Sequence, residues 1–235
     1  MSKSQILMMP VRTSKSRQFV AASSQSLLYT AVIVPGAGAF SAGGWIWLDS
    51  LAATRAVIST GGSNTFPGFC LHVNNNNRVV CFARGTDNTL VTTPDSGTAV
   101  AAGSWYHAAM VTTRGGSGTM KCYLNGTEVS TVSAASLDTI ATASVKRIGA
   151  FGSASYLWNG RLARVFYAAQ ALDSTDLAAL IAGAPTFARL NAVAAATAAK
   201  MTHFWDLNGT GTENDRVGTN HAAEANGPLA RTGGP

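Results

Sequence analysis

The stretch GSWYHAAMVTTRGGSGTMKCYLNGTEV, residues 103–129, decides the fold prediction for this chain. It holds three runs of strand character, at 105–113, 120–124 and 127–132, separated by clusters of Gly, Asn, Ser and Thr. Between the last two runs lies Asn125-Gly126, a pair that type I′ turns favour because both central residues need a positive φ. The stretch therefore predicts an antiparallel hairpin with a further strand before it.

Outward from this hairpin, the chain continues as short strand-like runs separated by Gly, Asn, Ser and Thr. Several short strands between turn residues indicate an all-β sandwich or barrel, and 235 residues suit one domain of that kind. The other predicted strands are 40–49, 55–60, 69–73, 78–84, 145–151 and 160–168.

The four asparagines at 74–77 predict a second hairpin, because Asn tolerates the left-handed backbone of tight turns. A turn symmetric about its centre places Cys70 opposite Cys81, on the same sheet face as His72. That register would allow a Cys70–Cys81 disulfide, but buried free thiols are the commoner state. With Cys122, the cysteines show no metal-ligand spacing, and we expect thiols in a reducing cytosol.

Helix signals appear only late in the chain. Asp173 and Asp176 have the spacing of a capping box, and Gly183 predicts the end of the helix that follows. The Ala-rich stretch 188–200 has high helix propensity, and 203–207 returns to strand character. The sequence thus predicts short C-terminal helices beside the β-sandwich.

Three ordered segments resemble one family. Residues 103–129, with a Trp-x-His strand and an Asn-Gly turn, resemble the central hairpin of laminin-G-like domains in the concanavalin A-like lectin/glucanase superfamily. Residues 146–180 resemble the closing segment of those domains, and 40–48 resemble their early Trp-containing strand. The resemblance covers about residues 18–182 and implies a jelly-roll sandwich of two antiparallel sheets.

The block at 204–227 departs from the family pattern. It resembles a segment that relatives place before the first sandwich strand, whereas here it follows the Ala-rich stretch. We expect a permuted order in which this block fills the usual edge position, because about thirty residues cannot form a second sandwich. The predicted organisation is a basic arm at 1–17, a laminin-G-like sandwich at 18–185, and a segment at 186–235 that completes the same domain.

Charge is scarce and unevenly distributed. Only 12% of the residues are charged, against roughly 25% in an average soluble domain, and the net charge is +6. The arm holds Lys3, Arg12, Lys15 and Arg17 without any acid. A nucleic-acid binder would usually carry more bases, and no run has the length of a secretory signal or a membrane span. We therefore expect cytoplasmic synthesis, with no nucleic-acid or membrane partner.

The acids argue against catalysis. The superfamily includes glycoside hydrolases, most of which use two carboxyl groups about 5–10 Å apart. This chain has three glutamates, Glu128, Glu213 and Glu224, and no acid stands two residues from Glu128. His107 is expected to be a packed, hydrogen-bonded histidine, and no nucleophile elbow or phosphate loop is present. We predict that the protein is not an enzyme and has no catalytic residue.

The resemblance also raises calcium as the only candidate cofactor. Many relatives bind calcium at the sandwich rim with oxygen ligands, which would implicate Asp87 and Asn88 here, with Asp49 and Asp138 as alternatives. Aspartate and asparagine are also ordinary turn residues, and that interpretation is favoured.

A glycan site would need exposed aromatic rings with polar groups beside them. Tyr156, Trp158 and Asn159 are the candidates, although Trp158 occupies a position that relatives use for packing. The alternative is that these residues belong to the core.

We therefore expect a non-catalytic binding or structural protein. The leading hypothesis is a virion structural component, such as a bacteriophage capsid decoration or fibre-associated protein, localised to the virion. Its arm residues Lys3, Arg12, Lys15 and Arg17 would dock on acidic surfaces of neighbouring subunits, including copies of the same chain; the alternative for the arm is a solvated tail. The alternative function is a carbohydrate-binding lectin module.

Overall fold

The computed structural model describes most of the chain from Lys15 onward. The described residues are 15–29, 33, 35–61, 67–95, 97–141, 145–152, 155–182, 186–209, 211–219, 221–227, 229–232 and 234–235, with backbone alone at 229–232. Lys3 and Arg12 of the predicted arm lie outside them.

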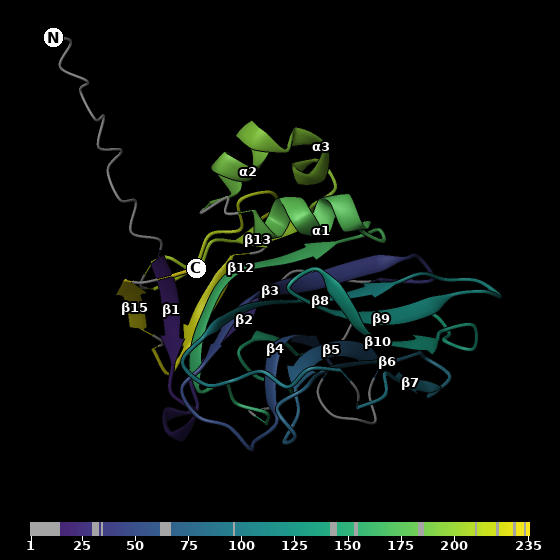
Figure 1. Cartoon of the computed structure of the whole chain (residues 1–235), viewed down its shortest axis with the longest axis horizontal. Coiled ribbons are helices and arrows are strands. Elements are labelled where there is room, and N and C mark those ends of the chain that lie inside the picture. The colour runs from purple at the N-terminus through teal and green to yellow at the C-terminus, as the bar shows by residue number, and fades with distance from the viewer. Residues whose placement is uncertain are drawn as a thin grey trace, which may run out of the picture.

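Two antiparallel sheets form the body of the molecule (Figure 1). Sheet A runs in the order β10 (Thr127–Ser133), β9 (Thr119–Leu124), β8 (Trp105–Thr112), β3 (Phe40–Leu48), β12 (Gly160–Ala168), β1 (Lys15–Phe19), β15 (Leu229–Thr232), and β13 (His203–Trp205) also pairs with β12. Sheet B runs in the order β14 (Ala222–Ala225), β2 (Ser26–Tyr29), β11 (Lys146–Ile148), β4 (Arg55–Thr60), β5 (Gly68–Val73), β6 (Val79–Arg84), β7 (Leu90–Thr92). The predicted jelly-roll sandwich is confirmed.

The core lies between the inner faces of the two sheets. Phe40, Ile46 and Leu162 from sheet A meet Phe69 and Leu71 from sheet B, all fully buried. Apolar and polar positions alternate along these strands because successive side chains point to opposite faces. The inner set forms this core and leaves the outer faces for other contacts.

Three short helices cover part of the outer face of sheet A (Figure 1). They are α1 (Ser174–Ile181), α2 (Phe187–Val193) and α3 (Ala195–Ala198), and a 3₁₀ turn, η1 (Ala21–Ser23), follows β1. Phe166, Leu177, Leu180 and Phe204 form a second apolar cluster between helices and sheet. None of the described helices has the length and apolar character needed to cross a membrane.

The predicted local signals at the helices and the first hairpin are confirmed. Asp173 and Asp176 form the capping box of α1, each side chain accepting a hydrogen bond from the other's backbone N–H. Asn125 and Gly126 both have positive φ, at 50° and 81°, as a type I′ turn requires. The Ala-rich stretch forms two helices instead of one, because the backbone leaves helical geometry at Ala194.

The register predicted for the second hairpin is wrong by one residue. Val73 pairs with Val79, so the loop has five residues, and Cys70 lies opposite Phe82 while Leu71 lies opposite Cys81. A one-residue shift moves every side chain of one strand to the other face. Cys81 therefore faces the core and Cys70 the outer side of sheet B, so these two cysteines do not face each other across the hairpin.

The segment predicted as an arm ends inside the sandwich. β1 begins at Lys15 and pairs with β12 on one side and β15 on the other. We call residues 203–232 the C-terminal block; it adds β13 and β15 to sheet A, and β14 beside β2 to sheet B. Residues far apart in the sequence thus form the edge where both sheets end.

Candidate functional site

A row of four side chains crosses the outer face of sheet A, away from the helices; three of them are half-buried and Gln18 is buried. Strand pairing aligns Gln18 on β1, Arg161 on β12, Trp47 on β3 and Trp105 on β8. The rings of Trp47 and Trp105 have centroids 5.7 Å apart, and the guanidinium of Arg161 lies 4.8 Å from the ring of Trp47. We call Gln18, Arg161, Trp47 and Trp105 the tryptophan row.

Asp49, directly after β3, fixes one end of this row. Its carboxylate accepts a hydrogen bond from Trp47 Nε1 at 3.1 Å and another from Gln18 Nε2 at 2.7 Å. Trp47 is therefore held by a hydrogen bond at its edge and a cation on its face. Neighbouring strands lie about 4.8 Å apart, so the four strands of the row span about 14 Å.

A second row lies beside the tryptophan row, two residues away along β3, β8 and β12. Trp45 pairs with His107 on β8 and with Ala163 on β12. The register of β12 shifts between Ala163 and Phe166, and Arg164 has a positive φ of 50°. Such a bulge directs two successive residues to one face, and it brings the guanidinium of Arg164 to 5.4 Å from the ring of Trp45.

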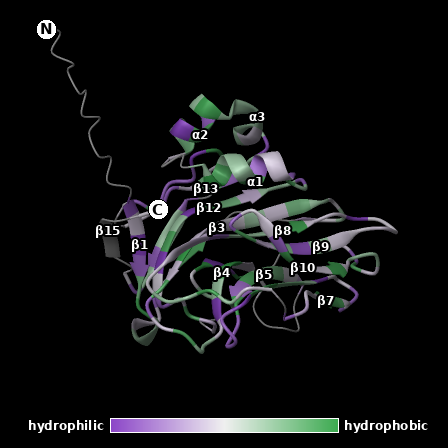
Figure 2. Cartoon of the chain, in the orientation of Figure 1, coloured by the Kyte–Doolittle hydropathy of each residue, from purple (hydrophilic) through white to green (hydrophobic). Residues whose placement is uncertain are grey.

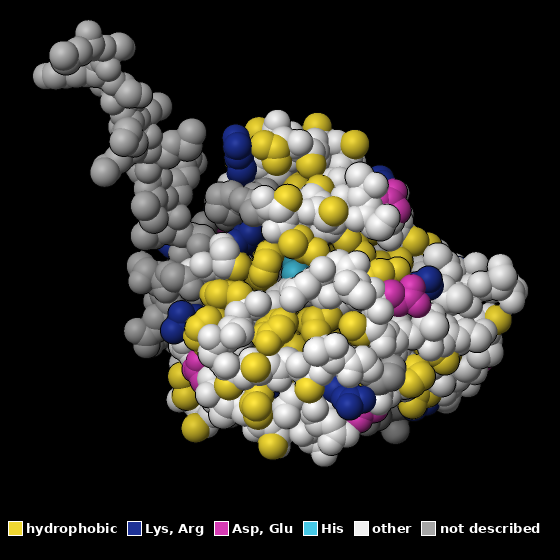
Figure 3. Space-filling model, viewed as in Figure 1, with side chains coloured by type: hydrophobic (Ala, Val, Ile, Leu, Met, Phe, Trp, Pro, Cys, Tyr) yellow, Lys and Arg dark blue, Asp and Glu magenta, His cyan; other side chains and the backbone are white. Residues whose placement is uncertain are grey.

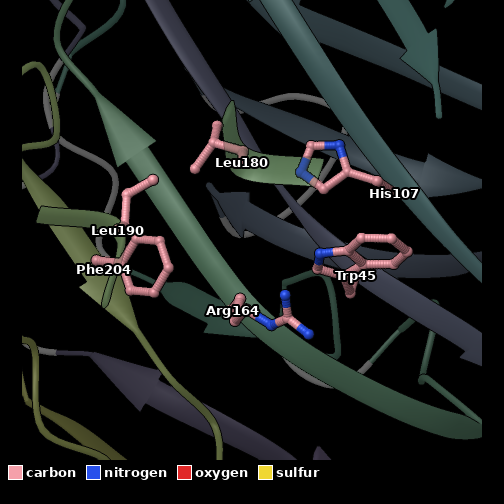
Figure 4. A pocket seen from close by; sticks show the side chains of 6 residues that line it. All are labelled: Trp45, His107, Arg164, Leu180, Leu190 and Phe204. Atoms are coloured by element: carbon pink, nitrogen blue, oxygen red, sulfur yellow. The ribbon is translucent and has the colours of Figure 1, made fainter. Parts of the chain in front are cut away.

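This second row ends in a cleft beneath the helices. Figure 4 shows Trp45 between Arg164 and His107, with Leu180, Leu190 and Phe204 on the helix side. These six side chains leave no room for a water molecule. Figure 3 shows hydrophobic side chains gathered on this face below the helical layer. The six side chains therefore fill this space themselves. The accessible part of the outer face of sheet A is the tryptophan row.

Burial sets the charge of the two polar groups in the cleft. Burial, reinforced by the nearby charge of Arg164, lowers the pKa of His107 to about 3, so its imidazole is neutral. Burial lowers the pKa of Arg164 to about 10, against the opposing effect of Asp206, so it remains a cation at neutral pH. His107 is packed as predicted, between Trp45 and Phe166, but its Nδ1 has no hydrogen-bond partner.

A separate pocket opens on the outer face of sheet B. It has a volume of about 200 Å³ and is lined by His72, Phe82, Leu90, Thr92 and Tyr156. Tyr156, one of the predicted glycan contacts, thus lines a pocket.

The other two predicted glycan contacts are placed differently. Trp158 is fully buried in the core between the sheets, so its prediction as a glycan contact is wrong, for the packing reason that the family pattern implied. Asn159 is half-buried, and its amide donates to Ser50 Oγ at 3.1 Å. It does not line the pocket around Tyr156.

Arg17 is not available to a neighbouring subunit, contrary to the predicted docking role. It is fully buried; its guanidinium donates to the carbonyls of Gly209 and Gly211 and forms ion pairs with Glu213 at 3.4 Å and Glu224 at 3.2 Å. Lys15 is exposed. The virion role itself stays a prediction.

The candidate calcium ligands engage nearby threonines. The Asp87 carboxylate accepts from the backbone N–H and the hydroxyl of Thr89, and Asp138 accepts from the hydroxyl of Thr86. Asn88 is exposed with a φ of 68°, the left-handed turn geometry expected of Asn. Among the described residues, no three His, Cys, Asp or Glu side chains are grouped to hold a metal. Calcium binding stays a prediction.

The glutamates are used in ion pairs. Glu128 bonds Lys121 at 2.8 Å on the edge hairpin, whereas Glu213 and Glu224 pair with Arg17. Within the tryptophan row and Asp49, the only carboxylate is that of Asp49, whose two oxygens already accept hydrogen bonds.

Comparison with known proteins places the chain in a family. Residues 21–178, more than half of the chain, match the family described as the concanavalin A-like lectin/glucanases superfamily. The chain therefore belongs to this superfamily. No curated protein matches the chain.

Solved structures with the same fold share little sequence with the chain. A "putative carbohydrate binding protein" from Bacteroides ovatus has a TM-score of 0.68 at 14% identity, over 95% of this chain and 61% of that protein. A heptameric SAP-like pentraxin from Limulus polyphemus has 0.54 at 17%, over 72% and 82%. The CBM40 of the Ruminococcus gnavus IT-sialidase has 0.52 at 18%, over 63% and 84%. The chain thus spans less than two thirds of the Bacteroides protein.

Proposed function

We propose that this chain is a non-catalytic carbohydrate-binding module whose glycan site is the tryptophan row. The observation that carries the proposal is the side-by-side placement of Trp47 and Trp105 on a solvent-facing sheet, with Arg161 on the ring of Trp47. Tryptophans in such a position are unusual for a face without a ligand, because large apolar rings gain from burial.

The chemistry of the row suits a sugar chain. A pyranose has an apolar C–H face that stacks on an indole ring, and hydroxyl groups at its edge that need donors and acceptors. The two indoles supply the stacking surface, while the exposed Asp49 and the half-buried Arg161 supply polar groups at its rim; the buried Gln18 holds Asp49 in place. A span of about 14 Å suits a short oligosaccharide lying across the strands.

The fold comparisons support the same class of function. The Bacteroides ovatus structure is described as a "putative carbohydrate binding protein", and the Ruminococcus gnavus structure as the CBM40 of an IT-sialidase. The lone, already hydrogen-bonded Asp49 supports a binding role over hydrolysis, which needs a pair of carboxyl groups.

A glycan array, followed by calorimetric titration of the best ligand, tests the proposal. We expect Trp47→Ala and Trp105→Ala each to weaken binding at least tenfold, or about 1.4 kcal/mol. Val193→Ala, an exposed apolar residue on α2, is the matched control and should bind as the parent does. Absence of any glycan ligand, or full affinity in both tryptophan variants, would refute the proposal.

A further inference from the structure

We propose that the pocket on the outer face of sheet B is a second, independent site that takes a single neutral pyranose ring. Its lining residues His72, Phe82, Leu90, Thr92 and Tyr156 enclose about 200 Å³, a space for one small ring. The inference rests on the proposed carbohydrate-binding function but concerns the opposite side of the sandwich.

Aromatic side chains build two walls of this pocket. The rings of His72 and Phe82 are 5.7 Å apart, and Tyr156 lies 5.8 Å from His72. Behind them, Phe151 stacks on Tyr156 at 5.5 Å and meets Phe82 edge-on. Leu90 forms a third apolar wall although 47% of it is exposed to solvent. These walls present the flat surfaces that a sugar C–H face needs.

The backbone holds Tyr156 in a strained position. Tyr156 has a φ of +50°, which is uncommon for a bulky residue. Its carbonyl accepts a 2.7 Å hydrogen bond from Ala56 N–H, and the preceding residue, Ser155, exchanges two backbone hydrogen bonds with Phe151. Strain of this kind persists only where the surroundings enforce it, and such residues cluster at binding sites.

The polar groups of the pocket are neutral. His72 is more than nine-tenths buried, and its Nδ1 has no hydrogen-bond partner. Burial lowers the pKa of His72 to about 4, so the ring is uncharged at neutral pH. Thr92 is exposed at the rim and adds a hydroxyl. Because no lining residue carries a charge, the pocket favours a neutral hydroxylated ligand over an acidic one.

Chemical-shift titration of the full chain with methyl glycosides tests this site. The probes are the methyl glycosides of glucose, galactose, mannose and N-acetylglucosamine, with methyl glucuronide as the acidic comparison. At about −0.3 kcal/mol per non-hydrogen atom, a ligand of this size binds with a Kd of about 1 mM. We expect saturable shifts at the pocket residues for at least one neutral probe, and at least tenfold weaker binding in Tyr156→Ala and Thr92→Arg.

Matched variants separate this site from the tryptophan row. Trp47→Ala should leave the pocket Kd within about twofold, and Thr92→Arg should leave the array ligand's affinity unchanged, because the sites lie on opposite sheets. The inference is overturned if no neutral probe shifts the pocket residues, if Thr92→Arg binds like the parent, or if the glucuronide binds equally well. If the glycan array shows no ligand but a methyl glycoside binds in the pocket, only the proposal for the tryptophan row is refuted.

A different observation carries a second inference: we infer that Cys81 and Cys122 are poised to form a disulfide between the two sheets. Cys81 lies on β6 of sheet B and Cys122 on β9 of sheet A, and their sulfurs are 2.7 Å apart. This is well inside van der Waals separation, about 3.5–4.0 Å even between carbon atoms. Forming the bond requires about 0.7 Å of further approach.

The oxidation is a thiol–disulfide exchange with a small-molecule disulfide such as oxidised glutathione. Each of the two thiols loses a proton, and one S–S bond forms between Cys81 and Cys122. The S–S bond of the oxidant breaks, and its two sulfurs take up the two electrons and the two protons to become thiols. Both sulfurs are fully buried, so exchange takes place as the chain folds, or when the sheets open.

Refolding in glutathione buffer, followed by alkylation under denaturing conditions and mass spectrometry, tests the bond. We expect one alkylated cysteine, Cys70, and a Cys81–Cys122 cross-linked peptide. Cys70→Ser should retain the cross-link, and Cys81→Ser should lose it. Three alkylated cysteines after oxidative refolding, or a cross-link to Cys70, would overturn the inference.

Discussion

Gly43 shows how a single residue shapes the face that carries the tryptophan row. A Cβ at this position would lie 2.6 Å from the carbonyl oxygen of Ala108 and 2.8 Å from the ring of Phe166. Only a residue without a side chain lets Phe166 lie against β3. Phe166 in turn stacks on His107, and His107 meets Trp45 edge-on.

We expect Gly43→Ala to lower the free energy of unfolding by about 1–3 kcal/mol, as overpacking does. Urea denaturation measures the change. Gly116→Ala is the matched control, because a Cβ there meets nothing within 4 Å. Equal stability of the two variants would contradict the steric argument.

The buried histidines predict a pH dependence of stability. The pKa of His72 is lowered by burial to about 4, and that of His107 to about 3, from 6.5. The unfolded chain therefore binds protons that the folded chain does not, and stability falls as the pH drops from about 6.5 towards 4.

Urea denaturation between pH 7 and pH 4 checks this dependence. His107→Phe should flatten the fall over that range, because one of the two protons no longer contributes. Val193→Ala, at an exposed position without a titratable group, should leave the slope as in the parent. A slope unaffected by His107→Phe would show that other groups cause the dependence.

At the scale of elements, β1 depends on the ion pairs of Arg17. Removing the cation leaves Glu213 buried and unpaired, a condition that typically costs about 3–5 kcal/mol. Arg17→Met should therefore destabilise the protein strongly in urea denaturation, and adding Glu213→Gln should recover part of the loss. Lys15→Met, exposed on the same strand, should change stability by less than about 0.5 kcal/mol. If Arg17→Met were as stable as the parent, the ion pairs of Arg17 would not be what stabilises β1.

The same strand explains where the sequence misleads. β1 reads KSRQF and is largely hydrophilic (Figure 2), yet four of its five residues are buried. Arg17 looks like part of a basic tail because its partners, Glu213 and Glu224, follow about 200 residues later. Strands bounded by turn residues, such as those within 105–133, were predictable, because their signals lie within a few residues of each other.

The site was predictable in part. Tyr156 could be chosen as an aromatic residue beside polar ones, but the cavity around it comes from β5, β6 and β7. For the tryptophan row, Trp47 stands two residues after Trp45 of the second row on one predicted strand, and Trp105 opens another. Residues two apart on a strand share a face, so Trp45 and Trp47 are expected on the same face of their strand. Which strands are neighbours, and that the helices leave this face uncovered, depends on the three-dimensional arrangement.

At the scale of the whole molecule, the two sheets present different outer faces. The helices cover one part of sheet A (Figure 1). The tryptophan row lies on the part that they leave open, while sheet B carries the pocket. The two proposed sites thus point away from each other. A chain that binds sugar on both could connect two glycans, and its avidity would exceed the affinity of either site alone.

The edge of the sandwich allows a test of the permuted order. Lys15 at the start of β1 pairs with Thr232 at the end of β15, in an antiparallel register. A four-residue linker from Thr232 to Lys15 would therefore close a hairpin. New termini between Lys200 and His203, after α3, would move the C-terminal block ahead of the sandwich, as in the family pattern.

We expect this circular permutant, which omits residues 1–14 and 233–235, to fold with a Tm within about 5 °C of the parent and to bind the array ligand equally. The reason is that every described strand pair and the Arg17 ion pairs are retained. Thermal unfolding by circular dichroism and calorimetric titration measure both. The matched control ends at Thr202 and should not fold cooperatively, because it lacks β13, β14, β15 and the partners of Arg17. A permutant that fails like this control would show that the block must follow the sandwich in the chain.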